Sequence, residues 1–281
     1  MVIIDQDQCN GCGLCIRICH EHCISWSDDR LIIDRRFCST CSQCVAVCPR
    51  KALRWDQHPP HAFDRTLYPG PEQVRELLME RRTNREHTGK SIERSTLKEI
   101  AGMAAYAPTH NFDLRVIIID DQEILRMIDS VIFRFSIKLY RWVYAPKLMH
   151  LLVRTFAPAW EFEYRKAKPK LEAIRDRNQQ FKTLPAAVIL IAGDRRVPLS
   201  LQSAQYALYN MDLYAQSKGL ACRNLVGNQG ILNGNREFRK MIGLGRNERI
   251  FGTIAMGHPA VRFRNKVAGR SLPVQWNTIR N

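Results

Sequence analysis

The chain has 281 residues, 45% of them hydrophobic, and carries a formal net charge of +16. This length suits one small and one ordinary domain, at roughly 100–200 residues per domain. The longest uninterrupted apolar run covers residues 186–192, far short of the ~18 residues that a membrane span requires. The first residues also lack the basic and apolar regions of a signal peptide. We therefore expect a cytoplasmic protein without a transmembrane segment.

The positive charge is unevenly distributed along the chain. Residues 1–60 hold seven basic and seven acidic side chains, so the whole excess lies in residues 61–281. Residues 124–184 alone hold thirteen basic and five acidic side chains, which is half of that excess. A basic surface can attract nucleic acid, anionic lipid, an acidic protein or a phosphate ligand. No nucleic-acid recognition motif accompanies the charge, and we expect no nucleic-acid partner.

Eight of the ten cysteines form two runs with the same spacing, C-x2-C-x2-C-x3-C. This spacing resembles that of bacterial ferredoxins with two 4Fe–4S clusters. The resemblance implies that the first three cysteines of each run bind one cluster, while the fourth ligates the other cluster. The implied ligand sets are Cys9, Cys12, Cys15 and Cys48 for cluster 1, and Cys38, Cys41, Cys44 and Cys19 for cluster 2.

Two other chemistries can also use cysteine-rich runs. A disulfide framework fits poorly, because nothing marks the chain as secreted and thiols stay reduced in the cytosol. A zinc site fits poorly too, since zinc ligands favour paired C-x2-C units rather than two complete quartets. The remaining cysteines, Cys23 and Cys222, are interpreted as small buried apolar residues and receive no role.

Hydrophobic spacing and turn residues divide the chain into two parts. The cysteine-rich unit ends near Trp55, and the prolines of residues 56–61 interrupt regular structure. We therefore predict an α+β protein with domains at residues 1–58 and 68–281.

Helices and strands alternate in the predicted second domain. A capping box, Thr96 with Glu99, predicts where its second helix begins, and Gly219 predicts the end of a long helix. The predicted helices start at residues 71 and 96 and cover residues 200–217, and the predicted strands cover residues 114–119, 186–192 and 250–256.

Four short segments of this domain carry glycines, basic residues and hydroxyl groups in a fixed order. They are Arg81-Arg82-Thr83-Asn84-Arg85, Ala107-Pro108-Thr109-His110-Asn111, residues 219–227, and Gly257-His258-Pro259 with the basic residues that follow. In this order, behind two cysteine runs, they resemble the FMN-dependent nitroreductase family, in the subgroup with an N-terminal two-cluster ferredoxin. The first segment supplies guanidinium groups and a hydroxyl, which are the donors that a phosphate dianion needs.

The resemblance implies a mixed sheet flanked by helices, and a homodimer with both flavins at the interface. Residues 107–111 would then contact the neighbour's flavin. Asn224 stands where the family usually has tryptophan, and Ala221 stands where it has a second glycine. No Rossmann fingerprint or P-loop sequence competes with the FMN interpretation. The implied cofactor-binding residues are Arg81, Arg82, Thr83, Arg85, Pro108, Thr109, Asn111, Val226, Gly227, Lys266 and Arg270.

Residues 124–184 are an insertion with apolar residues at helical spacing and basic residues between them. The simplest interpretation is a helical hairpin that packs on its own domain and exposes a basic face. The alternatives are a lid over the flavin, a docking face for an acidic redox partner, and a helix at the membrane surface. As a lid, the segment would turn Phe135 and Trp142 inward to exclude water. Glu161 and Tyr164 could then reach a substrate, by analogy with dehalogenating members of the family.

Together these features predict an iron–sulfur flavoprotein reductase. Electrons would pass from two 4Fe–4S clusters to FMN and on to a small organic acceptor, because flavin joins one-electron to two-electron chemistry. The acceptors that the resemblance implies are nitroaromatics, quinones and activated alkenes. The alternatives are an electron-transfer module that serves a protein partner, or a reductive dehalogenase-like member of the same family. The sequence leaves open whether an acidic ferredoxin or NAD(P)H supplies the electrons.

Overall fold

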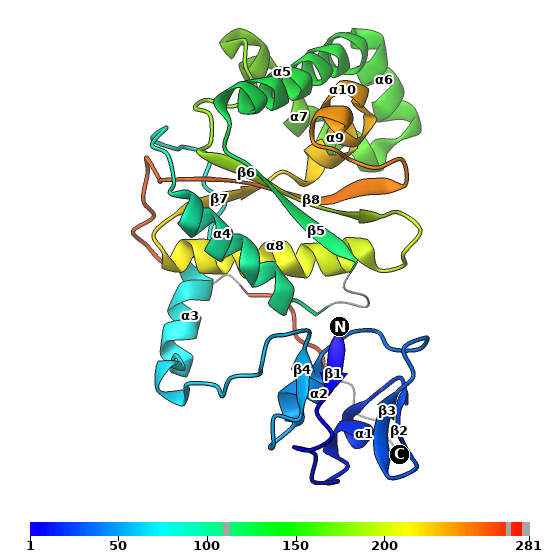
Figure 1. Cartoon of the computed structure of the whole chain (residues 1–281). Helices are drawn as coiled ribbons and strands as arrows, with labels where there is room; N and C mark the ends of the chain where they lie inside the picture. The colour runs from blue at the N-terminus through cyan, green and yellow to red at the C-terminus, as the bar shows by residue number, and fades with distance from the viewer. Residues whose placement is uncertain (109–112, 268–270, 277–281) are drawn as a thin grey trace.

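The computed structural model describes residues 1–108, 113–267 and 271–276, and Figure 1 shows the course of the chain. The described residues form a small N-terminal part with two two-stranded sheets and a larger part with one four-stranded sheet. Helices accompany the sheets in both parts, so the predicted α+β class is confirmed. No helix among the described residues is long and apolar enough to cross a membrane.

The N-terminal part contains two similar units, each with a short helix that begins after a left-handed residue. Its elements are β1 (Val2–Ile4), α1 (Leu14–Ile18), β2 (Ile24–Ser27), β3 (Arg30–Ile33), α2 (Gln43–Val47) and β4 (Leu53–Trp55). Gly13 (φ 70°) precedes α1, and Ser42 (φ 58°) precedes α2. The left-handed conformation turns the chain sharply, which brings closely spaced cysteines onto one loop. Strand β1 pairs with β4, and β2 pairs with β3, both antiparallel.

A small apolar core holds the N-terminal part together. Leu31 and Leu53 are each only 1% exposed, and the thiols of Cys15 and Cys44 are buried in the same cluster. Because so few apolar residues contribute, the cysteines make up much of the interior. Cofactor binding and folding are therefore expected to be coupled in this part.

The larger part is built on a sheet with the strand order β5-β6-β8-β7, in which every neighbouring pair is antiparallel. The strands are β5 (Leu114–Ile119), β6 (Ala187–Asp194), β7 (Ala221–Asn224) and β8 (Glu248–Gly257). The α-helices outside residues 124–184 are α3 (Pro71–Glu80), α4 (Arg94–Gly102), α8 (Ser200–Ser217), α9 (Gln229–Gly234) and α10 (Arg236–Met241). Short turns lie at η1 (Arg65–Leu67), η2 (Met103–Tyr106) and η5 (Val226–Asn228).

The expected mixed sheet differs from the one observed. Helix α8 follows β6 and carries the chain across the sheet, beyond the position that β8 occupies. Strand β7 therefore runs in the same direction as β6 but pairs with the edge of β8 that faces away from β6. The last strand then enters between them in the opposite direction. All pairings among the described strands are consequently antiparallel.

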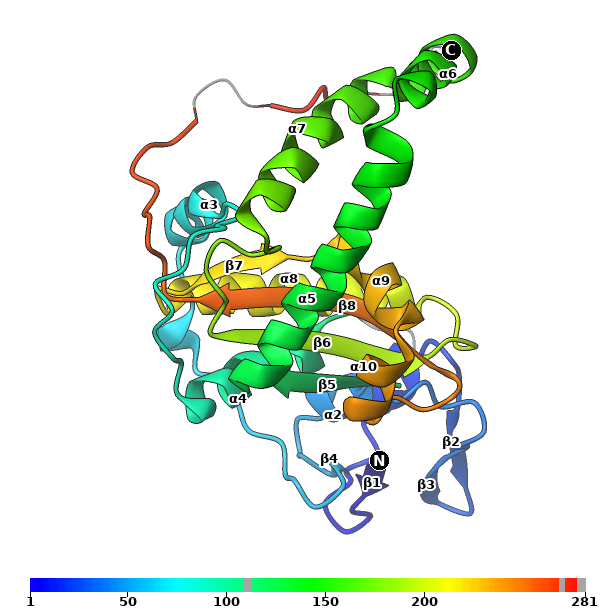
Figure 2. The same ribbon diagram turned by 90° about the horizontal axis from the view of Figure 1, so that it is seen from above.

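Helices cover both faces of the sheet, with α4 and α8 on one face and α9, α10 and the first helix of the insertion on the other (Figures 1 and 2). Side chains of β6 alternate between the two layers, as the strand period requires. Ile189 and Ile191 enter the core that contains Leu208 of α8, whereas Val188 and Leu190 enter the opposite core. Both faces of β6 are therefore buried, which explains its unbroken apolar sequence.

One glycine lets a helix lie close against the sheet. A Cβ atom at Gly252 in β8 would lie 2.7 Å from Cδ1 of Leu208 in α8. Real Cβ atoms essentially never come so close to another heavy atom. The absence of a side chain at this position thus sets the distance between α8 and the sheet.

The observed boundaries agree with most of the predicted ones. Helix α8 covers residues 200–217 as predicted, and Gly219 follows it with φ 75°. Helix α4 begins earlier than the predicted capping box, because Leu97 N already donates to the carbonyl of Glu93 at 3.0 Å. Thr96 therefore lies inside the first turn instead of capping it.

The insertion is helical, as predicted, and projects from the sheet in Figure 2. Its elements are α5 (Gln122–Leu139), a π-helical turn η3 (Tyr140–Tyr144), α6 (Lys147–Phe156), η4 (Pro158–Trp160) and α7 (Glu161–Arg177). Asp121 caps α5 by accepting hydrogen bonds from two backbone amides. The expectation that Phe135 and Trp142 turn inward is wrong in this chain, because they are 46% and 72% exposed. The core-facing stripe of α5 consists of other residues, Leu125, Ile128 and Ile132 among them.

Candidate functional site

Four cysteines from both runs line one small cavity in the N-terminal part. Cys38, Cys41 and Cys44 come from the second run, and Cys19 comes from the end of the first. The cavity has a volume of about 30 Å³. Helices α1 and α2 pack against each other, which brings the end of one run to the start of the other. These four residues are the ligand set predicted for cluster 2.

Of the cysteines predicted for cluster 1, Cys9 and Cys12 precede α1, Cys15 lies in α1, and Cys48 follows α2. Burial raises the pKa of Cys15, and the neighbouring thiols of Cys9 and Cys12 add to the rise. The sulfur of Cys48 accepts a hydrogen bond from the backbone amide of Ala52 at 3.3 Å. An amide donor of this kind stabilises a sulfur that carries negative charge.

Among the described residues, no three His, Cys, Asp or Glu side chains are grouped so that they could hold a metal ion. A cubane cluster differs from zinc because each thiolate binds a different iron, so its ligands surround a larger space. Burial, followed by Cys41, Cys38 and Cys15, raises the pKa of Cys44 to about 11. This thiol would therefore have to release its proton in order to bind iron.

Cys23 is a close neighbour of the cavity that sequence reasoning left without a role. Its sulfur lies 3.4 Å from the sulfur of Cys19, and it also lines the cavity. Burial and the contact with Cys19 raise the pKa of Cys23 to about 12. In the sequence, the position of Cys23 four residues after Cys19 is the signal that could have indicated this proximity.

A basic pocket opens where α3 ends and the segment 263–267 passes beside it. Its volume is about 680 Å³, within the range of roughly 300–1,000 Å³ for cofactor sites. Five of the predicted cofactor-binding residues line it together, namely Arg81, Arg82, Thr83, Arg85 and Lys266. Arg264 adds a further guanidinium group that was not predicted. The size and the donors of this pocket fit a phosphorylated cofactor.

Carboxylates hold two of these cations in place. Nη1 of Arg81 lies 3.6 Å from Oδ2 of Asp212, which is 6% exposed at its side chain. Lys266 pairs with Glu76 of α3. Arg82 is held differently, since its Nη1 donates to the carbonyls of Met79 and Arg81. A phosphate would therefore meet guanidinium groups whose orientation is already restricted.

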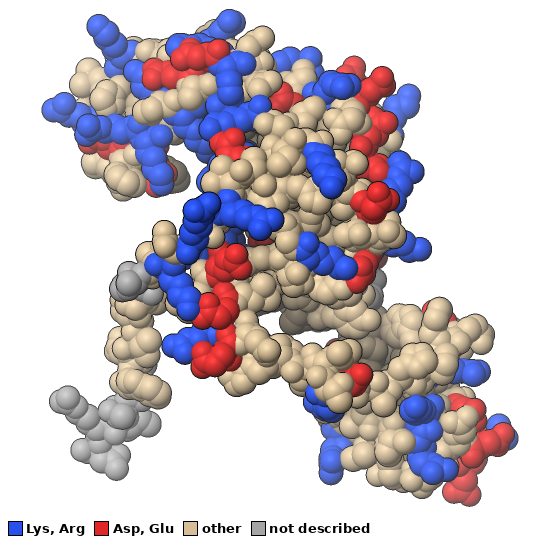
Figure 3. All heavy atoms as spheres, turned by 90° about the vertical axis from the view of Figure 1, so that its left-hand side faces the viewer, with Lys and Arg blue, Asp and Glu red and all other residues tan. Residues whose placement is uncertain are grey.

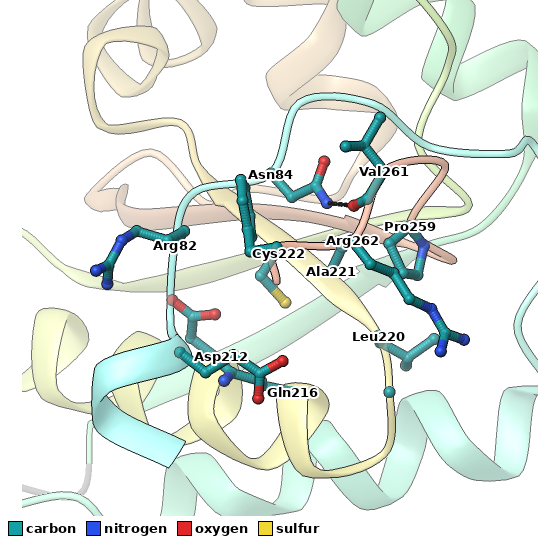
Figure 4. Close-up of a pocket in the computed structure, with 13 residues that line it drawn as sticks. Arg82, Asn84, Asp212, Gln216, Leu220, Ala221, Cys222, Pro259, Val261 and Arg262 are labelled. Carbon is teal, nitrogen blue, oxygen red and sulfur yellow. Dashed lines mark hydrogen bonds between the residues drawn. The ribbon is translucent and has the colours of Figure 1, made fainter. Parts of the chain in front are cut away.

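A second, smaller pocket of about 190 Å³ shares Glu80, Arg82 and Phe263 with the first, and Figure 4 shows its lining residues. Asn84 donates from Nδ2 to the carbonyl of Val261 at 2.8 Å, and its backbone amide donates to the carbonyl of Cys222 at 3.0 Å. These bonds fix the segment after α3 between β7 and the C-terminal segment. Burial raises the pKa of Asp212, although Arg81 opposes the rise. Burial and the Asp212 carboxylate also raise the pKa of the Cys222 thiol.

Sequence reasoning missed Asp212 and the environment of Cys222. Asp212 lies within α8 and reads as a solvated polar residue, because helical periodicity does not show that α3 and β7 cover this position. Cys222 itself is buried, as predicted from the sequence.

The remaining predicted cofactor-binding residues are not gathered in the basic pocket. Val226 and Gly227 lie in η5, at the far end of β7, and Val226 is 56% exposed. Pro108 is exposed after η2. Thr109, Asn111 and Arg270 lie outside the described residues.

The two predicted substrate-contacting residues of the insertion differ in their surroundings. Tyr164 is buried between the rings of Tyr144 and His150, and its hydroxyl donates to the carbonyl of Val143 at 2.8 Å. This hydroxyl is engaged inside the insertion, so we do not propose a catalytic role for it. Glu161 begins α7 and lies 4.0 Å from Nε2 of His150.

Comparison with known proteins associates both parts of the chain with families. The family model described as the Nitroreductase family matches residues 78–258. The model described as a 4Fe-4S dicluster domain matches residues 8–53. No curated protein sequence matches the chain.

Several solved structures share the fold at low sequence identity. A nitroreductase with bound FMN from Desulfitobacterium hafniense DCB-2 has a TM-score of 0.53 and 16% identity, covering 72% of this chain and 98% of its own. An oxidized iodotyrosine deiodinase bound to FMN and 3-iodo-L-tyrosine has a TM-score of 0.51 and 20% identity, covering 73% and 99%. An FMN-dependent nitroreductase from Clostridium difficile R20291 has a TM-score of 0.51 and 13% identity, covering 74% and 100%. At these identities the likeness concerns the fold.

Proposed function

This chain belongs to the nitroreductase family, and from that premise we propose that it passes electrons from two 4Fe–4S clusters to FMN and on to a small organic acceptor. It is an oxidoreductase with an N-terminal 4Fe–4S dicluster domain. The observation that carries the proposal is the basic pocket, where residues from both ends of the larger part meet. We also propose domain limits at residues 1–58 and 68–281. The backbone bond from Asp56 N to the carbonyl of Met1, at 2.7 Å, supports them by closing the first domain.

The basic and hydroxyl side chains that line the pocket would bind FMN. Arg81, Arg82, Thr83, Arg85 and Lys266 would bind its phosphate and ribityl chain. When bound, FMN supplies the conversion between one-electron and two-electron transfer. The protein supplies orientation and charge compensation, because guanidinium groups offset the phosphate dianion in a partly enclosed site.

The clusters would be held by the two predicted sets of cysteines. The cavity formed by Cys19, Cys38, Cys41 and Cys44 supports the second set. Each predicted set joins cysteines of both runs, so a bound cluster would link the two halves of this part. Cluster binding would consequently stabilise a part of the chain with little apolar core.

We further propose a homodimer. The pocket of one chain does not gather Val226, Gly227 and Pro108, which leaves room for a second copy to complete the flavin site. Exposed apolar residues on α3 and α8 provide a surface for it, including Leu78, Tyr206 and Tyr209. Burial of such a surface would favour association.

Anaerobic purification tests the proposal directly. We expect one FMN per chain, about eight irons and eight acid-labile sulfides, as two cubane clusters require, and a dimer by light scattering. Photoreduced protein should be re-oxidised by nitroaromatics or quinones. If only another protein re-oxidises it, the chain is an electron-transfer module. If neither FMN nor iron is retained, the proposal is wrong.

A further inference from the structure

A group of four cations lies beside β7, and the proposed function uses only one of them, Arg85. We call Arg85, Lys170, Arg177 and Arg223 the β7 cation cluster. In residues 1–108, 113–267 and 271–276, none of these four side chains forms an ion pair with a carboxylate. Arg177 and Arg223 are half-buried and Arg85 and Lys170 are exposed. Like charges gathered without a carboxylate between them disfavour one another.

Three chain segments meet at this position. The backbone bond from Asn84 to Cys222 places Arg85 beside β7. The guanidinium carbon of Arg223 lies 5.5 Å from the ring centroid of Phe181, which follows α7. Lys182, the next residue, pairs with Glu86. The end of the insertion therefore packs against both the segment after α3 and strand β7.

The side chains also point to a shared region. Along β7, Cys222 enters the core on the α8 side, so Arg223 faces the opposite side of the sheet, where Phe181 belongs to the core. Lys170 and Arg177 are seven residues apart in α7, two helical turns, and so lie on one face of that helix. The insertion and the sheet each contribute cations to the same region.

Electrostatics agree with this arrangement. Burial lowers the pKa of Arg223, and Arg85 and Arg177 lower it further. Loss of surrounding water lowers the pKa of Lys170, followed by the effects of Arg223 and Arg85. Nε of Arg177 is buried without a hydrogen-bond partner among the described residues. In Figure 3 the molecule is hollowed beneath the projecting insertion, and Lys and Arg side chains gather around the hollow.

We propose that the β7 cation cluster binds the carboxylate of an anionic organic acceptor and positions that acceptor at the flavin. The inference rests on the proposed function and adds the charge class of the substrate. Arg85 also lines the basic pocket, so the cluster adjoins the proposed flavin site. Arg223 would hold the carboxylate with its planar fork and Lys170 would add a point charge. The carboxylate takes no part in the electron transfer, which occurs at another group of the acceptor.

A matched pair of ligands tests the inference. We choose 4-nitrobenzoate and its uncharged analogue 4-nitrobenzamide, and measure their binding to the FMN-loaded protein from the perturbation of flavin absorbance. Arg223→Gln and Lys170→Met should each weaken 4-nitrobenzoate binding about tenfold, as loss of a bond to a charged group does, and leave 4-nitrobenzamide unchanged. Lys168→Met, on another face of α7, is the matched control and should change neither. Re-oxidation of photoreduced protein by the two compounds should show the same split.

The outcomes separate this inference from the proposed function. If wild-type protein holds FMN and binds both ligands equally, the inference is overturned and the proposed function stands. If the variants lose FMN while the preference for the anion persists, the cluster serves the flavin itself and the inference is wrong. If both ligands weaken together, the cluster only shapes the pocket. A wild-type chain that retains no FMN would overturn the proposed function and this inference with it.

Discussion

The two cofactor regions of this chain are built in opposite ways. The eight clustered cysteines lie within residues 9–48, and two five-residue helices bring them together. The basic pocket draws its side chains from residues 76–85 and 263–267, with Asp212 of α8 behind Arg81. The first region is specified by local spacing, whereas the second exists only after the sheet and its helices have assembled.

The two regions also differ in their charge. The N-terminal part is formally neutral and offers thiols, which become anionic when they bind iron. The larger part carries the whole excess of positive charge and offers guanidinium and ammonium groups. Each region is therefore incomplete without a group of opposite charge, and damage to one should leave the other intact.

Substitution of a predicted cluster ligand should have the largest effect. Cys41→Ser should reduce iron from about eight to about four per chain, since one cubane loses a ligand. The N-terminal part should also unfold more easily, because its apolar core is small. FMN content should not change. Iron, sulfide and FMN analysis with circular dichroism measures all three quantities.

Cys23→Ser is the matched control for this prediction. Cys23 lines the same cavity as Cys41 but belongs to neither predicted ligand set, so the variant should retain its iron. A loss of iron from Cys23→Ser together with full iron in Cys19→Ser would reverse the assignment of these two neighbours.

Arg81→Ala should weaken FMN binding by about 1.5–3 kcal/mol, the range for a hydrogen bond to a charged group. The buried carboxylate of Asp212 would also lose its partner. Titration of FMN followed by fluorescence quenching gives the dissociation constant. Arg75→Ala, on the same helix with an exposed ion pair, should bind FMN as wild type does. Unchanged iron in both variants would support the independence of the two regions.

Gly252→Ala should lower the free energy of unfolding of the larger part by about 1–3 kcal/mol, through overpacking against Leu208. Iron content should remain at the wild-type value. Gly102→Ala provides the control, because a Cβ atom there meets nothing within 4 Å. Chemical denaturation monitored separately by flavin release and cluster absorbance would measure the effect. A parallel loss of cluster stability would show that the two parts unfold together.

Charge reversal on α5 and η3 should have the smallest effect. Arg134, Lys138 and Arg141 are exposed, and a basic face raises the association rate of an acidic electron donor. The triple variant to Glu should slow reduction by a ferredoxin at low salt, and the difference should shrink as salt increases. Stopped-flow measurement of cluster reduction compares the triple variant with the control variant Lys98→Glu, on α4. If the triple variant and the wild type are reduced at equal rates at all salt concentrations, the basic face of α5 and η3 only contacts solvent. If the triple variant loses binding to lipid vesicles instead, the face contacts a membrane.

Much of the fold could be predicted because it depends on patterns within single elements. Continuous apolar sequence predicted strand β6, and helical spacing with Gly219 predicted α8. Helical spacing also predicted the insertion. The same spacing could not show which surface each helix meets, so Phe135 and Trp142 were expected to face inward and are exposed.

The sequence by itself determined the cysteine chemistry, the family resemblance and the basic segment after α3, since each depends on residue types at short separations. Only the tertiary structure decided that Asp212 and Cys222 are buried behind Arg81, that Tyr164 is enclosed by the insertion, and that Arg223 and Lys170 belong to one cluster. The physical reason is that burial and charge coupling depend on distances between segments far apart in the chain. Periodicity reports which face of an element is apolar, but not which other element covers it.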